Sequence, residues 1–540
     1  MIVYFIAGFI LFVVTGAIVF FAFFYEDFLN AYAVPKLEEA ARTATDGVYR
    51  LKLDRVYYKH FKVFCTGFDL ERIYYERGAQ GTAVKRVNID TVEFTGVNLW
   101  NIFWNRSLSL TSIQMDSPKI YMTDLSLEKP APADIVNDSL LKKNGTMKLP
   151  AISFDSIALR DIRLFLPDKS GIKDIPSFRG ISFRLTDFYY NSQTKEANPV
   201  LFSKRADVAI PNIVYPIGDG TYSLEFRNLR GNSEDSVITV EKFAYVPNYS
   251  EHQFAERYPH PTDRLDLRCG GIRIEGINFI SSISSANIVF RKCTVNSWFL
   301  DSFEDRTKPA DPHPPNAPML NDLFNSLPIK IDIDSIVFRN GEIRIRERRG
   351  GAIGSLGFTH TFVAISPVSK DTLTTHYKKP AQITFSTYFL GDALFNGVAS
   401  YPLSDKEFNM DLHASLGSFA VPKLNTFLVP MERLEVTGGE LRKAKIDMRI
   451  RSGVATTTVI PIYRGFAVKF LSNNPKTKPG LTEKIKTFIA KSFILDEENA
   501  DEGKLLVGTT THPRLATDAF MQFIWESLRK SLGKVVGGFQ

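Results

Sequence analysis

Apolar and polar side chains alternate along most of residues 48–475, which is the two-residue period of a strand with one buried face. The clearest stretch is LPIKIDIDSIVFRNGEIRIRERRGG (327–351). Its Asn340-Gly341 pair is typical of a tight turn, so the pattern predicts a hairpin with one apolar and one charged face. The predicted apolar face consists of Ile329, Ile331, Ile333, Ile336, Phe338, Ile343 and Ile345.

The same pattern recurs elsewhere in the chain. LSLTSIQMDSPKIYM (108–122) aligns without a gap on residues 331–345, and Ile113, Met115 and Ile120 join the apolar face through this alignment. ISFDSIALRDIRLFL (152–166) repeats the Asp-Ser-Ile sequence and the Arg that follows it. Several runs with one offset indicate a repeated strand unit, while an ordinary sandwich with similar strands remains the alternative.

The N-terminal 25 residues differ from the rest because they carry no charged side chain. About 20 apolar residues are enough to cross a membrane as a helix. A cleaved signal peptide is the alternative, but the apolar run exceeds the usual ~7–15 residues and no basic region precedes it. The segment therefore predicts a retained anchor, followed by a short helix in PKLEEAARTA (35–44). The distribution of Lys and Arg residues on the two sides of this segment weakly favours a cytoplasmic location for the rest of the chain.

Helical spacing returns near the C-terminus, at 481–495 and 514–535. The second helix has an apolar stripe that either lies in a membrane interface or packs on its own domain. Candidate membrane-interface residues are Phe520, Phe523 and Trp525 here, and Trp100 and Trp104 in an aromatic segment early in the β-region. Two Pro-rich stretches, 125–150 and 303–328, suggest the divisions 1–25, 26–130, 145–302, 325–475 and 476–540.

Composition and motifs argue against several classes of function. The net charge of +7 over 540 residues is too dilute for nucleic-acid binding. The eight His residues show no metal-binding spacing, and neither G-x-S-x-G nor a phosphate-binding Gly-rich loop occurs. Three Cys residues make no disulfide framework, although Cys269 and Cys293 either pair or stay as buried thiols. We therefore expect no enzyme, no cofactor and no metal.

A sheet with one apolar face must bury that face, and few helices precede the C-terminus to cover it. If the sheet curls, the face becomes a concave lining suited to acyl chains. The expected fold is mainly β: a transmembrane helix, then an elongated, curled, mostly antiparallel groove of repeated strand hairpins, ending in amphipathic helices. The apolar residues named above are the candidate lipid contacts.

The apolar N-terminus followed by GVNLWNIFWNRSLSLTSIQMDSPKIYM (96–122) resembles the start of AsmA-like envelope proteins of Gram-negative bacteria. FNGVASYPLSDKEFNMDLHASLGSFAVPKLNTFLVP (395–430), followed by LEVTGGELRKAKIDMRI (434–450), is similar to their C-terminal region. The resemblance covers most of the chain through short motifs and supplies no catalytic residues. It implies an inner-membrane anchor and a periplasmic β-groove associated with phospholipid movement, and this outweighs the weak charge bias.

Two functional hypotheses follow from these patterns. The first is a membrane-anchored lipid-binding or lipid-transfer protein that carries phospholipid acyl chains and supports outer-membrane lipid homeostasis. The second is a non-catalytic envelope scaffold or assembly factor with a closed β core and other envelope proteins as partners. They differ in whether the apolar strand face is open to a ligand or packed.

Overall fold

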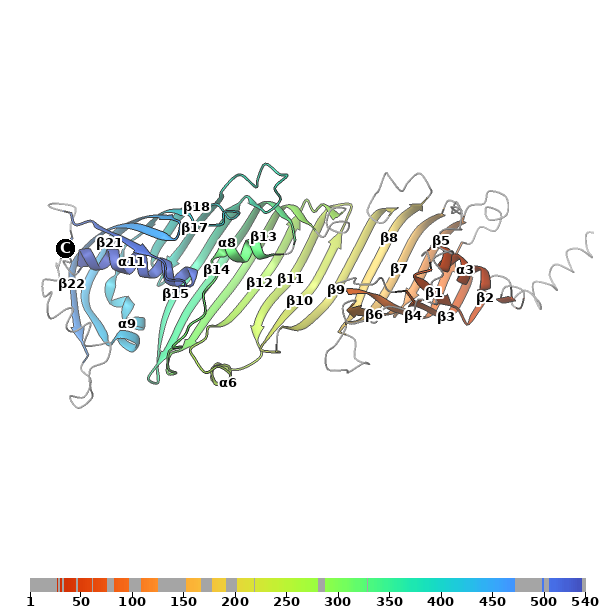
Figure 1. Ribbon diagram of the computed structural model, residues 1–540, viewed down its shortest axis with the longest axis horizontal. Coiled ribbons are helices and arrows are strands. Elements are labelled where there is room, and N and C mark those ends of the chain that lie inside the picture. The colour runs from red at the N-terminus through yellow and green to blue at the C-terminus, as the bar shows by residue number, and fades with distance from the viewer. Residues whose placement is uncertain are drawn as a thin grey trace, which may run out of the picture. The chain divides into compact units, whose positions relative to one another are not determined.

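The computed structural model describes residues 27, 30–31, 34–44, 47–60, 62–74, 82–96, 108–124, 152–166, 177–190, 202–217, 219–279, 287–327, 329–471, 498–499 and 505–536. The fold is mainly β with few helices, as the alternation predicts (Figure 1). The chain divides into two compact units, Met1–Val214 with Arg227–Asp235, and Tyr215–Phe226 with Ser236–Gln540. The division crosses two strands, β9 (Ser203–Ile217) and β10 (Tyr222–Asn232).

The first unit is a sheet with one helix at its start. In chain order, its elements before β9 are α3 (Val34–Ala44), β1 (Tyr49–Lys52), β2 (Arg55–Lys59), β3 (Lys62–Arg72), β4 (Thr82–Thr95), β5 (Leu108–Asp116), β6 (Lys119–Asp124), β7 (Ile152–Phe165) and β8 (Phe178–Tyr190). Helix α3 confirms the helix expected at 35–44. The strands pair antiparallel except that β5 and β6 both run parallel to β7.

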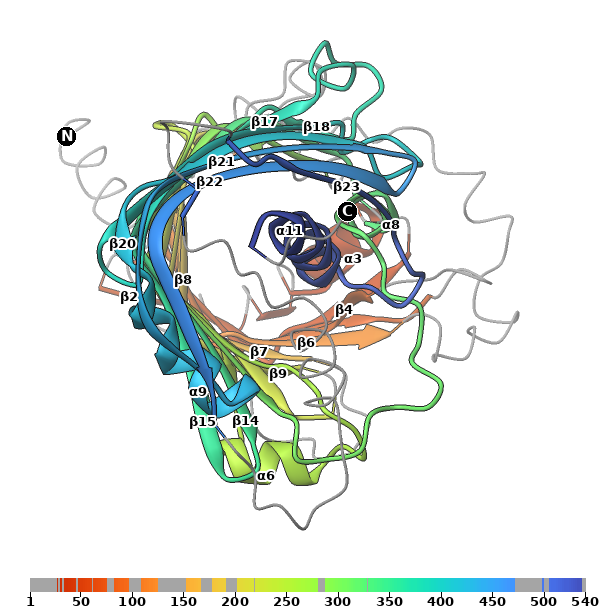
Figure 2. The same ribbon diagram turned by 90° about the vertical axis from the view of Figure 1, so that its left-hand side faces the viewer.

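The second unit contains the longer strands. After β10 come β11 (Val237–Pro247), α6 (Glu251–Glu256), β12 (Arg264–Glu275), β13 (Ile288–Asp305), α8 (Leu320–Ser326), β14 (Ile331–Arg349), β15 (Ala352–Ser366), β16 (Val368–Ser369), β17 (Ala381–Phe389), β18 (Ala393–Tyr401), β19 (Met410–Leu416), β20 (Phe419–Ala420), η3 (Val421–Leu424), α9 (Asn425–Glu432), β21 (Leu434–Arg451), β22 (Val454–Phe470), β23 (Gly508–Pro513) and α11 (Phe520–Val536). Among the pairings described from β11 to β23, all are antiparallel except that of β13 with β14. Figure 2 shows β17, β18, β21 and β22 curving around α11.

The predicted hairpin at Asn340-Gly341 is wrong, because β14 runs through it as one strand of 19 residues. A two-residue type I′ turn needs a positive φ at both central residues, but only Asn340 has one, at 48°. The residue forms a β-bulge, and the chain reverses later at Gly350-Gly351. The repeated unit is therefore a bulged strand and not a hairpin.

The two aligned repeats carry the same bulge. Ser117, which the ungapped alignment places over Asn340, has a φ of 53° and separates β5 from β6. Asp161 has a φ of 51° within β7, which continues from Ile152 to Phe165. Because β5 and β6 both pair with β7 in parallel, they are successive parts of one strand path. The periodicity thus located the repeat correctly but misjudged its geometry.

Several predictions fall where the structure gives no description. The expected anchor at 1–25, the tryptophans Trp100 and Trp104, and the expected helix at 481–495 all lie outside the described residues. Among the residues that are described, no helix is both long and apolar enough to cross a membrane. The C-terminal helix expected at 514–535 is confirmed as α11, although it begins only at Phe520.

Candidate functional site

Helix α11 identifies one side of the second unit's sheet, which we call the inner face. The Ser531 hydroxyl on α11 donates to the Thr457 carbonyl of β22 over 2.9 Å. Ala455 and Val459, which alternate with the outward positions of β22, are buried beside this contact. Figure 2 shows that α11 lies on the concave side of these strands, so the inner face is concave here.

The strand register carries the inner face from β22 back to β11, because residues opposite each other across a ladder point to the same side. The chain of pairs begins at Ala455–Ile450 and Ile450–Met410. Along β19 we move from Met410 to Leu412, which points to the same side because it is two residues on. From there the pairs are Leu412–Ala399, Ala399–Ile383, Ile383–Ile365, Ile365–Ile336, Ile336–Cys293, Cys293–Ile274 and Ile274–Ile238. Every member is apolar, so one continuous apolar surface crosses ten strands.

Four of the predicted contact residues meet on this inner face. Phe338 lies opposite Val295 and Val363, and Ile343 lies opposite Leu300 and Phe358. Ile336 and Ile345 lie on the same side by the same register. The bulge at Asn340 makes this possible, since Phe338 and Ile343 are an odd number of positions apart and would otherwise face opposite ways.

Aromatic rings form cross-strand contacts along the inner face. Phe226 contacts Phe243 with ring centroids 5.1 Å apart, and Trp298 meets Phe338 edge-on at 6.0 Å. Phe358 contacts Phe389 at 5.1 Å. These six rings are half-buried rather than enclosed. Part of this apolar surface is therefore accessible, and water-exposed ring surface forfeits the free energy that full burial would provide.

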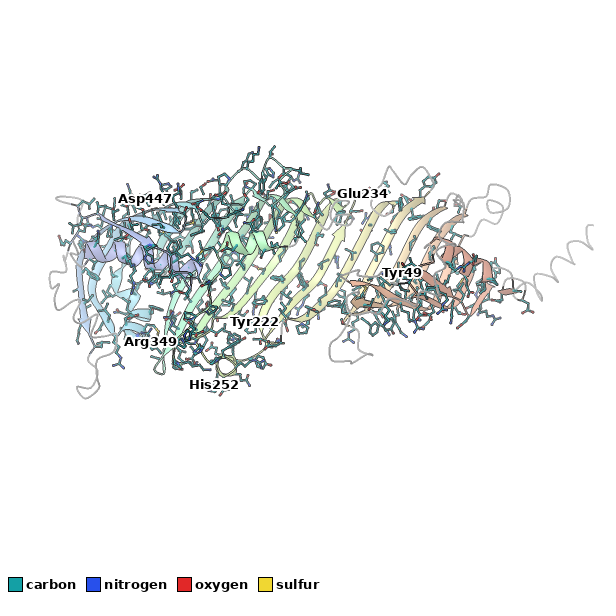
Figure 3. All side chains as sticks on the ribbon, in the orientation of Figure 1. Tyr49, Tyr222, Glu234, His252, Arg349 and Asp447 are labelled. Atoms are coloured by element: carbon teal, nitrogen blue, oxygen red, sulfur yellow. The ribbon has the colours of Figure 1, made fainter. Side chains whose placement is uncertain are left out.

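Helices cover the inner face only in places. Helix α11 packs on β22 and β23, and α9 packs on β14, β15 and β21, where Phe427 and Met431 lie over Gly354. Helix α6 adds one contact, in which Phe254 meets the Tyr222 ring edge-on at 5.7 Å (Tyr222 is labelled in Figure 3). Helix α8 reaches the start of β13, because Phe324 of α8 and Phe290 of β13 pack against the same core cluster. Beyond that end, none of the described helices has extensive contact with β12 or β13. The surface is therefore closed beside β22 and at the start of β13, and it is partly accessible farther along β13.

The opposite, outer face is charged. Arg268 pairs with Asp266 at 2.8 Å on β12, and Arg344 pairs with Glu342 at 3.1 Å on β14. Arg346 is enclosed more deeply, because it pairs with Asp301 on the neighbouring strand and with Glu251 of α6. These pairs satisfy the charges without reaching the inner face. The two faces thus differ in polarity as the alternation predicted.

Three predicted contacts lie at or just before the start of β14, in or against a core cluster that Ile336 also contacts. Ile331 and Ile333 are only 8% and 6% exposed and form a core cluster with Val368. Phe324 of α8 and Ile329 pack against this cluster. These isoleucines stabilise the attachment of α8, and they have little surface left for a ligand.

The predicted residues of the first unit lie in or beside its own core. Ile113 is buried with Cys65 and Val92, and Met115 packs against that cluster together with Val34 of α3. Ile120 is half-buried. Its partners across the ladder are Val87 and Leu164. The first unit thus has the same alternating apolar pattern, but its apolar face is buried at Ile113.

The C-terminal membrane-interface candidates separate into buried and exposed residues. Phe523 is 0% exposed and Phe520 packs against the same core, whereas Trp525 is 56% exposed. Phe523 therefore has no surface to offer a membrane in this conformation. The pattern did not predict that Ser527 and Ser531 would be fully buried on α11, since serine is a polar residue. Ser527 and Ser531 follow Phe523 at successive intervals of four residues, which places all three on one side of the helix and was the available signal.

The described cysteines are all free thiols. Cys269 lies opposite Trp298 and Cys293 lies opposite Ile274, so the two are not partners across the ladder. Burial raises the pKa of both thiols, which keeps them protonated at neutral pH. Within the described ranges, no group of His, Cys, Asp and Glu side chains could hold a metal ion.

Sequence reasoning overlooked most of the inner face, because it concentrated on the repeat with the clearest alternation. Leu267, Val295, Trp298, Leu300 and Phe358 complete the surface around the predicted residues. The same two-residue period, followed through β12, β13 and β15, would have found them. Comparison with known proteins adds no further assignment: the sequence matches no protein-family profile, and no curated protein is significantly similar to it.

Proposed function

We propose that the inner face of the second unit binds lipid acyl chains, and that the protein is a membrane-anchored, non-enzymatic lipid-binding or lipid-transfer protein. The observation that supports this most is the continuous apolar surface on β11–β19, which is half-buried beside β13 and fully covered beside β22. A surface of this kind needs an apolar occupant. Each CH₂ group that leaves water gains about 0.8 kcal/mol, so an acyl chain suits it well.

The resemblance to AsmA-like proteins extends the proposal to location and cargo. In this view residues 1–25 anchor the chain in the inner membrane and the body lies in the periplasm. Phospholipid is then the expected cargo, and outer-membrane lipid homeostasis the expected process. The charged outer face is compatible with this arrangement, because ion-paired side chains can remain in water while the inner face holds lipid.

Site-specific photo-crosslinking tests the proposal. A photoreactive phenylalanine analogue is placed at Phe338, which lies on the accessible inner face, and the full chain is illuminated in cells. We expect a crosslink to phospholipid, identified by mass spectrometry after the protein is purified. Lipid that co-purifies in mild detergent should exceed the amount carried by Phe338→Asp.

Two matched positions serve as controls. Met448 lies on the same inner face but is buried under α11, and Arg344 lies on β14 but on the outer face. Neither should crosslink to lipid. Equal lipid crosslinks at all three positions would indicate nonspecific labelling. Protein crosslinks at Phe338 without lipid would favour the scaffold hypothesis instead.

A further inference from the structure

Four exposed leucines lie on two connected segments that we together call the leucine edge: Leu320, Leu323 and Leu327 of α8 and its C-terminal end, and Leu373 of loop 370–380. Leu323 is 51% exposed and Leu373 is 85% exposed. Residues 320, 323 and 327 are three and four positions apart and therefore lie on one side of the helix.

The opposite side of α8 is fixed to the second unit. Asn321 is buried, its backbone N–H donates to the Tyr401 hydroxyl over 2.8 Å, and its side chain donates to the Asp405 carbonyl over 3.2 Å. Lys370 donates to the carbonyls of Asn325 and Leu327, which joins the loop to the end of the helix. The exposed leucines thus project from a rigid support and are not frayed ends.

Positive charge accompanies the leucines. Lys378 and Lys379 are exposed at the end of the loop. Ion pairs in the described part of the chain involve neither of them. The acidic groups nearby are already engaged: Asp371 pairs with Lys330 at 3.6 Å, and Asp332 lies 3.1 Å from His376 Nδ1. The loop that carries Leu373 therefore also carries two exposed lysines that no described ion pair engages.

We propose that the leucine edge is a peripheral membrane-contact surface that recognises a bilayer containing anionic lipid. Leucines insert into the boundary of the acyl region while lysines contact acidic headgroups. A protein partner is a poorer match, since lysine is depleted in protein interfaces and leucine is rarely a binding hot spot. This contact goes beyond acyl-chain binding on the inner face and does not depend on it.

Vesicle flotation tests the contact with the full chain. The protein is held in phosphatidylcholine nanodiscs, which occupy the apolar N-terminal segment, and vesicles with or without phosphatidylglycerol are added. We expect the nanodisc-bound protein to float with the anionic vesicles only. The double variant Leu323→Asp/Leu373→Asp should reduce binding at least tenfold. Charge reversal by Lys378→Glu/Lys379→Glu should reduce it about fivefold or more per lysine, since each juxtamembrane lysine contributes about that factor.

Val398→Asp is the matched control, because Val398 is also a large exposed apolar residue but lies on the outer face of β18. It should float like the wild type. The proposal is overturned if the wild type ignores anionic vesicles or if the leucine variant floats unchanged. It is equally overturned if the leucine variant abolishes a dimer seen by light scattering, since the edge would then join copies of the chain. Phe338 crosslinking is measured separately, so a failure of either proposal can be recognised.

Discussion

Gly508 controls how closely α11 approaches the sheet, and Gly508→Ala should loosen that helix. A Cβ atom at this position would overlap the Ser531 carbonyl oxygen and lie 2.9 Å from Val535 Cγ2. Backbone atoms of a helix cannot turn aside as a flexible side chain can. The helix must therefore shift away from β23, and its hydrogen bonds to the sheet must lengthen.

The free-energy cost of this shift follows from the contacts that it disturbs. Overpacking of a well-packed site typically costs about 1–3 kcal/mol. A displaced helix also weakens the Ser531–Thr457 hydrogen bond of 2.9 Å and the Ser531–Thr510 hydrogen bond of 2.6 Å, each contributing about 1 kcal/mol. We therefore expect a loss of about 2–4 kcal/mol in the docking free energy of α11. This corresponds to a roughly 30- to 700-fold larger equilibrium constant for local opening.

Hydrogen exchange with mass spectrometry measures this opening directly. Peptides covering 520–536 should exchange faster in Gly508→Ala, while peptides from β12 should be unchanged. Gly533→Ala provides the control, because nothing lies within 4 Å of its Cβ position and alanine favours the helix by about 1 kcal/mol. It should slow exchange or leave it unchanged. Equal exchange of residues 520–536 in wild type and Gly508→Ala would refute the reasoning.

Three further predictions concern the inner face, the outer face and acidity. Gly341→Ala should displace the Trp298 ring, which the new Cβ would overlap, and destabilise β13 and β14 by about 1–3 kcal/mol, measured by hydrogen exchange. Arg346→Met should cost about 3–5 kcal/mol in the unfolding of the second unit, because Asp301 would remain buried without its partner. The pKa of His512 is lowered mainly by burial, so the undocked form takes up a proton first as pH falls below about 6.5, and α11 should be cleaved faster by protease at pH 5.5 than at pH 7.5.

Each of these predictions has a matched comparison. Gly357→Ala on β15 meets no atom within 4 Å and should be tolerated, unlike Gly341→Ala. Arg344→Met removes an exposed ion pair and should cost less than about 1 kcal/mol. His413 is exposed beside Asp447, so His413→Gln should preserve the pH dependence of α11 cleavage that His512→Gln removes. If a variant and its matched comparison give the same result, the contact assigned to that variant does not have the energy that we infer for it.

The two-residue alternation predicted strands, an apolar face and a charged face, and the structure confirms all three. It did so because side-chain direction in a strand depends only on local backbone geometry. Ile336, Phe338, Ile343 and Ile345 were placed together for this reason. Local sequence wrongly predicted a turn at Asn340. Whether this residue forms a turn or a bulge depends on whether the neighbouring strands continue past it on both sides of β14.

Local sequence also predicted α11 as an amphipathic helix, but the face it buries was decided by its partner. Ser527 and Ser531 are buried because Gly508 permits close approach, and that glycine is distant in sequence. Likewise, whether Ile333 is a core residue or a ligand contact depends on Phe324 of α8. The sequence by itself determined which residues are apolar and how they alternate. Only the tertiary structure decided which part of that apolar face is covered, because covering comes from helices that the local period cannot locate.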